Sequence, residues 1–472
     1  MGAETARLPL CTRCKEQDGI LDLRSEAVCE TCFASFIASK AIKRLEVLQR
    51  ETRGPRLPSR PQRYLLALSR GPSSTALLHI LNENVRRQRE RNQRVKFELV
   101  VAFVDVDVDD GVVQKRTNSS DPVSSAPVPS DSTTATDAVE VPSSSTPIST
   151  VTDAPEEATR PASPTDSFTA HFPEIPIHNI PLSSILSSPA VDWPSLPIQN
   201  TSLPPSQRLT DFFSRLPSAS ARADVSRLLT RHALFAAAAE HDCAVVLLGY
   251  TTTALAELTL SEAAKGRGFG IPWLVNDGAF PLPRTVDSLS SDADTDITFS
   301  PANGDSTPGV TPDKIQIYSP LREIFRKEVL TYLSIVRSPV GHPLADLFPP
   351  SEALGAVVSH RDLSLDDVVS RYFLGVEASY PSVVANVVRT TGKLNRAAPS
   401  LSGAQTDADS GVAGRQCGLC GVGLDPLGDE RWKGEIGEAD ALTLGAADGE
   451  HGNIREGKRN RLCYGCDRSV KA

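Results

Sequence analysis

Eight of the nine cysteines in this chain form four Cys-x-x-Cys pairs, two near each end. A Cys-x-x-Cys turn places two sulfurs on one side of a tight loop. Two such turns complete a tetrahedral set of thiolates, which suits Zn²⁺. The sequence therefore predicts two zinc sites. The expected ligands are Cys11, Cys14, Cys29 and Cys32 in the first site and Cys417, Cys420, Cys463 and Cys466 in the second.

Disulfides and redox-active dithiols are the alternatives for this spacing. The first ten residues contain no apolar run of the kind that a secretion signal needs. We therefore expect a cytoplasmic chain, in which paired cysteines more often bind metal than form disulfides. Iron–sulfur occupancy stays open, because four cysteines serve either kind of site. No apolar stretch approaches the ~20 residues that span a bilayer, so we expect no membrane association.

The ninth cysteine and the histidines do not suggest catalysis. Cys243 begins the apolar segment 243–249, which predicts a buried strand. A thiol among apolar groups has a raised pKa and is usually inert, so we interpret Cys243 as a core residue. The eight histidines show no paired spacing, and His232 and His241 fall on a predicted helix with ordinary core or surface roles. We expect no catalytic residue in this chain.

A possible phosphate-binding loop follows the apolar run 64–68, which predicts a buried strand. After the loop, residues 75–81 read as a helix. Small residues let backbone N–H groups turn inward, hydroxyls add donors, and the helix start attracts anions. The loop lacks the Gly-Lys-[Ser/Thr] ending of a Walker site, and a plain helix cap is the alternative. The loop residues are Ser69, Arg70, Gly71, Pro72, Ser73 and Ser74.

The order of the predicted elements indicates an α/β fold. A second strand at 97–104 follows the loop helix, and strand, turn, helix, strand is the start of a parallel sheet. Further elements continue the pattern. They are a helix at 34–49, a helix at 222–241, a strand at 243–249, a helix at 251–265 and a segment of helical character at 315–333.

Composition divides the chain into parts. Residues 111–170, rich in Ser, Thr and Pro, and the polar residues 285–310 cannot bury enough apolar surface to offset their ordering entropy. We expect both to be disordered insertions, with a phosphorylated regulatory segment as the alternative for the first. The predicted parts are an N-terminal zinc module with a basic helix (1–50), an α/β domain (60–395), a linker (396–416) and a C-terminal zinc module (417–472).

Two basic stretches stand out in a chain of net charge −9. The whole chain is too acidic for non-specific nucleic-acid binding, but clustered Lys and Arg can neutralise RNA phosphates locally. The alternative for both stretches is a solvated helix face. For residues 86–96, this alternative and RNA binding carry equal weight. We see no aromatic-interleaved platform for base stacking. The candidate RNA-binding residues are Lys40, Lys43, Arg44, Arg50, Arg53, Arg56, Arg60 and Arg63.

These motifs together resemble a known family. The strand followed by Ser-x-Gly-x-Ser-Ser resembles the Ser-Gly-Gly-x-Asp-Ser loop of the N-type ATP pyrophosphatases, which adenylate a substrate carbonyl. Residues 248–257 look like their Gly-His-x-x-Asp-Asp-x-Ala-Glu helix start. A four-cysteine module ahead of the loop is typical of the tRNA 2-thiolation branch. With 320–332 and 417–466 added, the order of motifs is similar to that of the cytoplasmic tRNA 2-thiolation protein 2 family.

The resemblance implies an adenine nucleotide alpha hydrolase-like (PP-loop ATPase-like) fold and a role as the second subunit of the eukaryotic wobble-uridine thiolase. It implies a heterodimer with a catalytic thiolase subunit, and tRNA as substrate. Sulfur would come from a thiocarboxylated ubiquitin-like carrier. It would be placed on carbon 2 of the wobble uridine in tRNAs for Lys, Glu and Gln.

Departures from the active enzymes indicate that this subunit has kept the fold and lost the reaction. Arg70 replaces a loop glycine, Ser73 replaces the loop aspartate, and Thr252 and Thr253 replace an acidic pair. The arginine side chain would crowd the approach of a triphosphate to the loop, and the other changes remove negative charge that could organise Mg²⁺. ATP binding by this subunit is therefore doubtful. The alternatives are an active ATP-dependent tRNA sulfurtransferase and a zinc-finger adaptor of a ubiquitin-like conjugation system.

Overall fold

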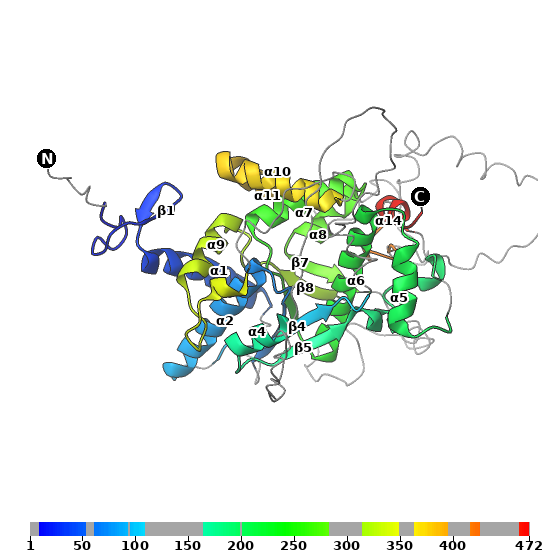
Figure 1. Ribbon diagram of the computed structural model, residues 1–472, viewed down its shortest axis with the longest axis horizontal. Helices are drawn as coiled ribbons and strands as arrows, with labels where there is room; N and C mark the ends of the chain where they lie inside the picture. The colour runs from blue at the N-terminus through cyan, green and yellow to red at the C-terminus, as the bar shows by residue number, and fades with distance from the viewer. Residues whose placement is uncertain are drawn as a thin grey trace, which may run out of the picture.

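A six-stranded, mostly parallel sheet forms the centre of the molecule (Figure 1). The computed structural model describes residues 9–52, 61–92, 95–108, 164–198, 201–282, 314–348, 363–394, 416–424 and 462–471. The strand order is β5-β4-β3-β6-β8-β7, and only β7 runs antiparallel to its neighbour. The predicted α/β class is confirmed. The strands are β3 Gln62–Ala67, β4 Phe97–Asp105, β5 Ile177–Pro181, β6 Val245–Leu247, β7 Gly278–Pro281 and β8 Lys314–Tyr318.

Helices cover both faces of the sheet. Along β3, Tyr64 and Leu66 belong to one hydrophobic core and Leu65 to the other, because successive side chains point to opposite faces. The first core packs under α1 Glu30–Thr52, α2 Pro72–Glu90 and α9 Arg326–Ile335. The second core takes side chains from α5 Pro205–Ser214, α6 Ala219–Glu240, α7 Thr252–Ala264, α8 Ile271–Val275, α10 Leu365–Ser379, α11 Pro381–Thr391 and α14 Tyr464–Val470.

Two predictions about local structure were wrong. Residues 315–333 are not one helical segment, because β8 comes first and α9 begins only at Arg326. Ile315 and Ile317 are both buried, and this two-residue alternation marks a strand. The insertion predicted at 111–170 also ends early, because helix α4 spans Pro164–His171 and buries Phe168 in the first core. The remainder, 111–163, and the insertion at 285–310 lie outside the described residues.

The N-terminal part is a small hairpin attached to the body by α1. Strands β1 Leu21–Leu23 and β2 Glu26–Val28 pair antiparallel, and α1 follows after Cys29. Figure 1 shows β1 projecting from the sheet, with α1 running back along the body. Arg24, in the hairpin turn, ties the hairpin to α9 through bonds of 2.6 and 3.0 Å to Glu328. Among the helices in the described ranges, none has the length and apolarity to cross a membrane.

Candidate metal centres and phosphate loop

The N-terminal cysteine cluster forms where the hairpin meets α1. Cys11 and Cys14 lie on a loop that is closed by bonds from Lys15 N to Cys11 O (2.9 Å) and from Cys11 N to Gln17 O (2.7 Å). Cys29 and Cys32 stand at the start of α1, where Cys32 N donates to Cys29 Sγ at 3.5 Å. One sulfur from each of the four cysteines lies within 4.8 Å of the others. The cluster predicted from spacing is therefore assembled.

The sulfur spacing fits one four-coordinate ion. A tetrahedral site with bonds of ~2.3 Å places its sulfurs about 3.8 Å apart, and Cys14 Sγ lies 3.8 Å from Cys29 Sγ. Burial opposes ionisation of Cys11, but backbone N–H groups lower its pKa to about 6. The hydrogen bond with Cys29 and burial raise the pKa of Cys32 to about 12. A cation at the centre would allow all four thiols to ionise together.

The C-terminal cluster has the same internal geometry. Cys420 Sγ lies 3.8 Å from Cys463 Sγ, and Cys463 N donates to Cys417 Sγ at 3.2 Å. The turn between Cys417 and Cys420 closes through Gly421, whose φ of 70° favours glycine. Hydrogen bonds from the other three thiols hold the pKa of Cys417 well below its ordinary value. The pKa values of Cys420 and Cys466 are raised by hydrogen bonds to neighbouring cysteines of the cluster.

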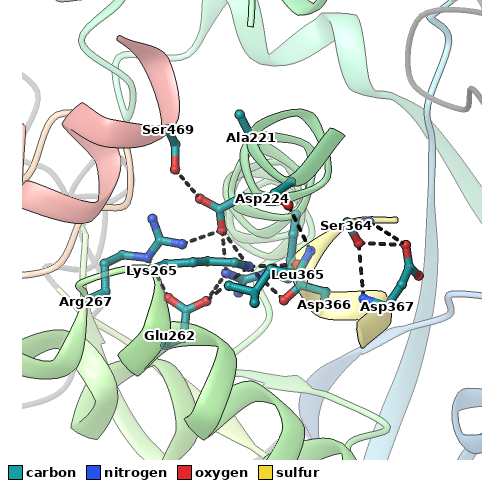
Figure 2. A network of polar contacts seen from close by, with 12 residues as sticks. Ala221, Asp224, Glu262, Lys265, Arg267, Ser364, Leu365, Asp366, Asp367 and Ser469 are labelled. Atoms are coloured by element: carbon teal, nitrogen blue, oxygen red, sulfur yellow. Dashed lines mark hydrogen bonds and ion pairs between the residues drawn. The ribbon is translucent and has the colours of Figure 1, made fainter. Parts of the chain in front are cut away.

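A buried network of charges supports the C-terminal cluster (Figure 2). The Arg267 side chain is 1% exposed, and its Nη1 donates to Cys466 Sγ at 3.8 Å. Its other nitrogens bond Glu262 at 2.6 Å and Asp224. Ser469 Oγ, on α14, donates to Asp224 at 2.9 Å. The charges balance, because three acids face three bases. They are Asp224, Glu262, Asp366, Arg227, Lys265 and Arg267.

His232 braces the same cluster from α6. Its Nε2 donates to Leu419 O at 2.8 Å, and a Cβ on Gly421 would lie 3.2 Å from its Cε1. Burial lowers the pKa of His232 to about 4, so the ring is neutral at physiological pH. The core interpretation of His232 is confirmed. Sequence reasoning missed Asp224 and Glu262, which lie within α6 and α7, and Arg267, which follows α7.

The predicted phosphate loop bonds to itself. It leads from β3 into α2, whose N-cap is Gly71. Ser74 Oγ donates to Gly71 O and Thr75 Oγ1 donates to the same oxygen, each at 3.0 Å, while Ser69 Oγ lies 3.1 Å from Ser74 Oγ. Gly249 packs so closely that a Cβ there would lie 2.9 Å from Ser74. The Ser69 and Ser74 hydroxyls are therefore engaged within the loop.

Arg70 and the two threonines have structural partners. Arg70 adopts a φ of 57°, and its guanidinium carbon lies 3.5 Å from the centroid of the Phe103 ring. Burial lowers the pKa of Arg70. Thr252 Oγ1 donates to Arg322 O at 2.8 Å, and Thr253 Oγ1 donates to the buried Glu377 at 2.7 Å. Both threonines fasten α7 to neighbouring segments, and neither carries the negative charge of an acidic pair.

Cys243 is a buried core thiol, as its position in the sequence predicted. Its side chain belongs to the second core and is 7% exposed. Burial raises its pKa to about 11, so it is protonated at neutral pH. A protonated, buried thiol is a poor nucleophile.

The structure brings some of the basic candidates together. Lys40, Lys43 and Arg44 lie on α1, and Lys40 and Arg44 each bond Glu323 at 3.0 Å. Arg50 donates to Glu46 O, and Arg63 pairs with Glu98 at 3.1 Å. In the second stretch, Arg86 and Lys96 also pair with acids of this chain. Candidates Arg53, Arg56 and Arg60 lie outside the described residues.

Comparisons with known proteins identify relatives of this chain. Residues 364–468 match the family model for Cytoplasmic tRNA 2-thiolation protein 2. The chain is 30% identical to Cytoplasmic tRNA 2-thiolation protein 2 of Phaeosphaeria nodorum, over 99% of this chain and 96% of the relative. It is 32% identical to the protein of that name from Sclerotinia sclerotiorum, over 80% of each. Among solved structures, the U34-tRNA thiolase NcsA of Methanococcus maripaludis matches at 13% identity and a TM-score of 0.42, over 81% of this chain and 86% of that one.

The match to the Phaeosphaeria protein extends along nearly the full length of both chains. The family that the sequence motifs predicted is thereby confirmed. This chain belongs to the cytoplasmic tRNA 2-thiolation protein 2 family.

Proposed function

We propose that this chain is the non-catalytic subunit of a heterodimeric tRNA 2-thiolase in the cytoplasm. A catalytic partner subunit takes sulfur from a thiocarboxylated ubiquitin-like carrier. It places the sulfur on carbon 2 of the wobble uridine in tRNAs for Lys, Glu and Gln. This chain supplies tRNA-binding surface and stabilises the partner. Membership of a family named for cytoplasmic tRNA 2-thiolation supports the pathway.

The state of the phosphate loop carries the non-catalytic part of the proposal. A triphosphate needs free backbone N–H groups and room above the loop. Here the Gly71 N–H already donates to Ser69 Oγ at 3.4 Å, and Arg70 lies against Phe103 on the neighbouring strand. The buried thiol of Cys243 adds support, because a sulfur carrier needs an accessible thiolate.

Zinc is the metal that we propose for both clusters. In each, two sulfurs from different Cys-x-x-Cys pairs stand 3.8 Å apart, which suits one ion bonded to all four. An iron–sulfur cluster favours a wider arrangement, since its cysteines bond different irons. Bound zinc would hold the two pairs of each cluster together and requires no redox chemistry.

The test is mass spectrometry of tRNA nucleosides from cells that lack this chain and carry either the wild-type gene or a Gly71→Ala variant. Gly71 has a φ of −84°, and an added Cβ meets only Ser69 Oγ at 3.4 Å, so the fold should tolerate alanine. The methyl group would obstruct a phosphate that approaches the loop. We expect wild type and Gly71→Ala to restore 2-thiolated uridine equally.

Loss of thiolation with a normally folded, normally abundant Gly71→Ala protein would favour the alternative, an ATP-using sulfurtransferase. Pyrophosphate release by the isolated chain would support that alternative independently. If deletion leaves thiolation unchanged, the proposal fails, and a zinc-finger adaptor of a ubiquitin-like conjugation system becomes the better explanation for the cysteines.

A further inference from the structure

A basic cavity of about 470 Å³ lies beside the N-terminal cluster, between α1 and the segment before α9. Four of its lining side chains are cationic and one is acidic. Cys32, a ligand of the N-terminal cluster, lines it as well. The charged residues are Arg13, Lys40, Lys43, Arg44 and Glu323. The cavity therefore has an excess of positive charge inside an acidic protein.

An aromatic ring gathers the cations. The Phe36 ring centroid lies 4.7 Å from the guanidinium carbon of Arg13, 5.3 Å from that of Arg24 and 5.9 Å from Lys40 Nζ. Cations within about 6 Å of a ring are attracted to its face. Phe36 thus offsets part of the repulsion between like charges at the cavity wall. No sequence motif indicates such a platform, because its cations come from separate parts of the N-terminal module.

Glu323 occupies the position of an anion within this cavity. Its carboxylate accepts from Lys40 Nζ and Arg44 Nη1, each at 3.0 Å. Partial burial opposes its ionisation, but these bonds hold the pKa of Glu323 below its ordinary value. The carboxyl side chain is 44% exposed, and exposed ion pairs contribute little free energy. An incoming anion of higher charge density can therefore displace it.

Lys43 is the cation that remains free for such a ligand. It is exposed, and within the described ranges it forms no ion pair. It stands one turn from Lys40 and beside Arg44 on α1, so all three can reach one phosphate group. A phosphate accepts several charge-assisted hydrogen bonds at once, which a single carboxylate does less well.

We propose that this cavity binds a backbone phosphate of tRNA, with Glu323 holding the anion position until the RNA displaces it. The inference rests on the proposed function, which makes tRNA the partner. A nucleotide suits the site better than an acidic peptide, because its base can stack on Phe36 or on an arginine plane beside the phosphate. Glu323 then weakens RNA binding, although it lies in the binding site.

This role predicts opposite effects from two substitutions in one cavity. Glu323→Gln frees Lys40 and removes one of the two carboxylates that pair with Arg44, the other being Asp277, so tRNA should bind more tightly. Lys43→Ala removes a phosphate contact, so tRNA should bind less tightly. The matched control is Asp211→Asn on α5, which changes the net charge equally and frees Arg215 from an exposed pair. Helices α5 and α1 lie on opposite sides of the molecule in Figure 1.

The experiment measures the affinity of the full-length chain for a fluorescent tRNA-Lys transcript over a range of salt concentrations. For Glu323→Gln we expect about two- to fivefold tighter binding. We also expect the log–log salt slope to steepen by about 0.7–0.9, as for one added phosphate contact. Lys43→Ala should weaken binding by a similar factor, and Asp211→Asn should match wild type.

Other outcomes separate the two proposals. If wild type binds tRNA but Glu323→Gln behaves like Asp211→Asn, the cavity is not the site and only this inference fails. If neither the wild-type chain nor any of the variants binds tRNA, the tRNA-binding role in the proposed function fails as well. Polyglutamate tests the acidic-protein alternative. If it displaces the tRNA, and if the Glu323→Gln variant has a higher affinity for polyglutamate than for tRNA, the cavity recognises an acidic protein and the inference is overturned.

Discussion

The two cysteine clusters share one motif and differ in their surroundings. In the N-terminal cluster, Cys11 and Cys29 are buried and join the first core, while Cys14 and Cys32 are half-buried, and a short hairpin and the start of α1 carry them. In the C-terminal cluster, Cys417, Cys420 and Cys466 are at most 2% exposed and belong to the second core, and only Cys463 is half-buried. Figure 1 shows the contrast, with β1 projecting from the body and α14 packed beside α6.

This difference shows that one ligand pattern can serve two structural purposes. A metal in the N-terminal cluster would order a module that presents a basic cavity to solvent. A metal in the C-terminal cluster would complete the core, because its cysteines are joined through Arg267 and Ser469 to charges on α6 and α7. The first metal should therefore govern a surface, and the second should govern the stability of the whole α/β body.

The largest expected effect comes from comparing Cys466→Ser with Cys14→Ser. Each should lose one equivalent of metal. Cys466→Ser should lower the free energy of unfolding of the α/β body by more than about 5 kcal/mol, since metal binding contributes directly to folding and the vacated site is buried. Cys14→Ser should change that transition by less than about 1 kcal/mol and unfold only the hairpin. Thermal unfolding and amide hydrogen exchange measure both. Equal destabilisation by the two variants would break the comparison.

A smaller effect is expected from the charges that support the C-terminal cluster. Arg267→Met leaves Asp224 and Glu262 buried without their main partner, which should cost about 3–5 kcal/mol. The matched variant is Arg215→Met, which breaks an exposed pair with Asp211 and should cost at most about 1 kcal/mol. Urea unfolding gives both values. If Arg267→Met proved as mild as Arg215→Met, the C-terminal cluster would not depend on this network.

The smallest effect is expected at the cysteine outside both clusters. Cys243→Ser should leave the metal content at wild-type level and restore tRNA thiolation in cells that lack the wild-type chain. Its only cost should be about 1 kcal/mol of stability, because a hydroxyl replaces a buried thiol. Metal analysis and nucleoside mass spectrometry check the two expectations. Abolished thiolation with normal folding would give Cys243 a chemical role and contradict its interpretation as a core residue.

The sequence alone determined the features that depend on local spacing. The two Cys-x-x-Cys pairs of each cluster predicted which sulfurs come together, and the apolar runs around Tyr64 and Val246 marked central strands of the sheet. Small residues and hydroxyls marked the turn from β3 into α2, whose use as a phosphate site stays a prediction. Each of these signals lies within a few residues of chain, where backbone geometry leaves few alternatives. The segment 315–333 was the exception, because a five-residue strand and a helix were taken as one periodic pattern.

Only the tertiary structure decided which charges meet. Arg267 and Cys466 are 199 residues apart, and Lys40 and Glu323 are 283 residues apart, yet each pair is in contact. A charged residue in a sequence does not reveal whether it will be solvated, buried against an opposite charge or placed over an aromatic ring. Those outcomes depend on which faces of distant helices the sheet brings together. For this reason the sequence identified the two cysteine clusters, while the fold decided that one lies against the buried charges of α6 and α7 and the other borders a basic cavity.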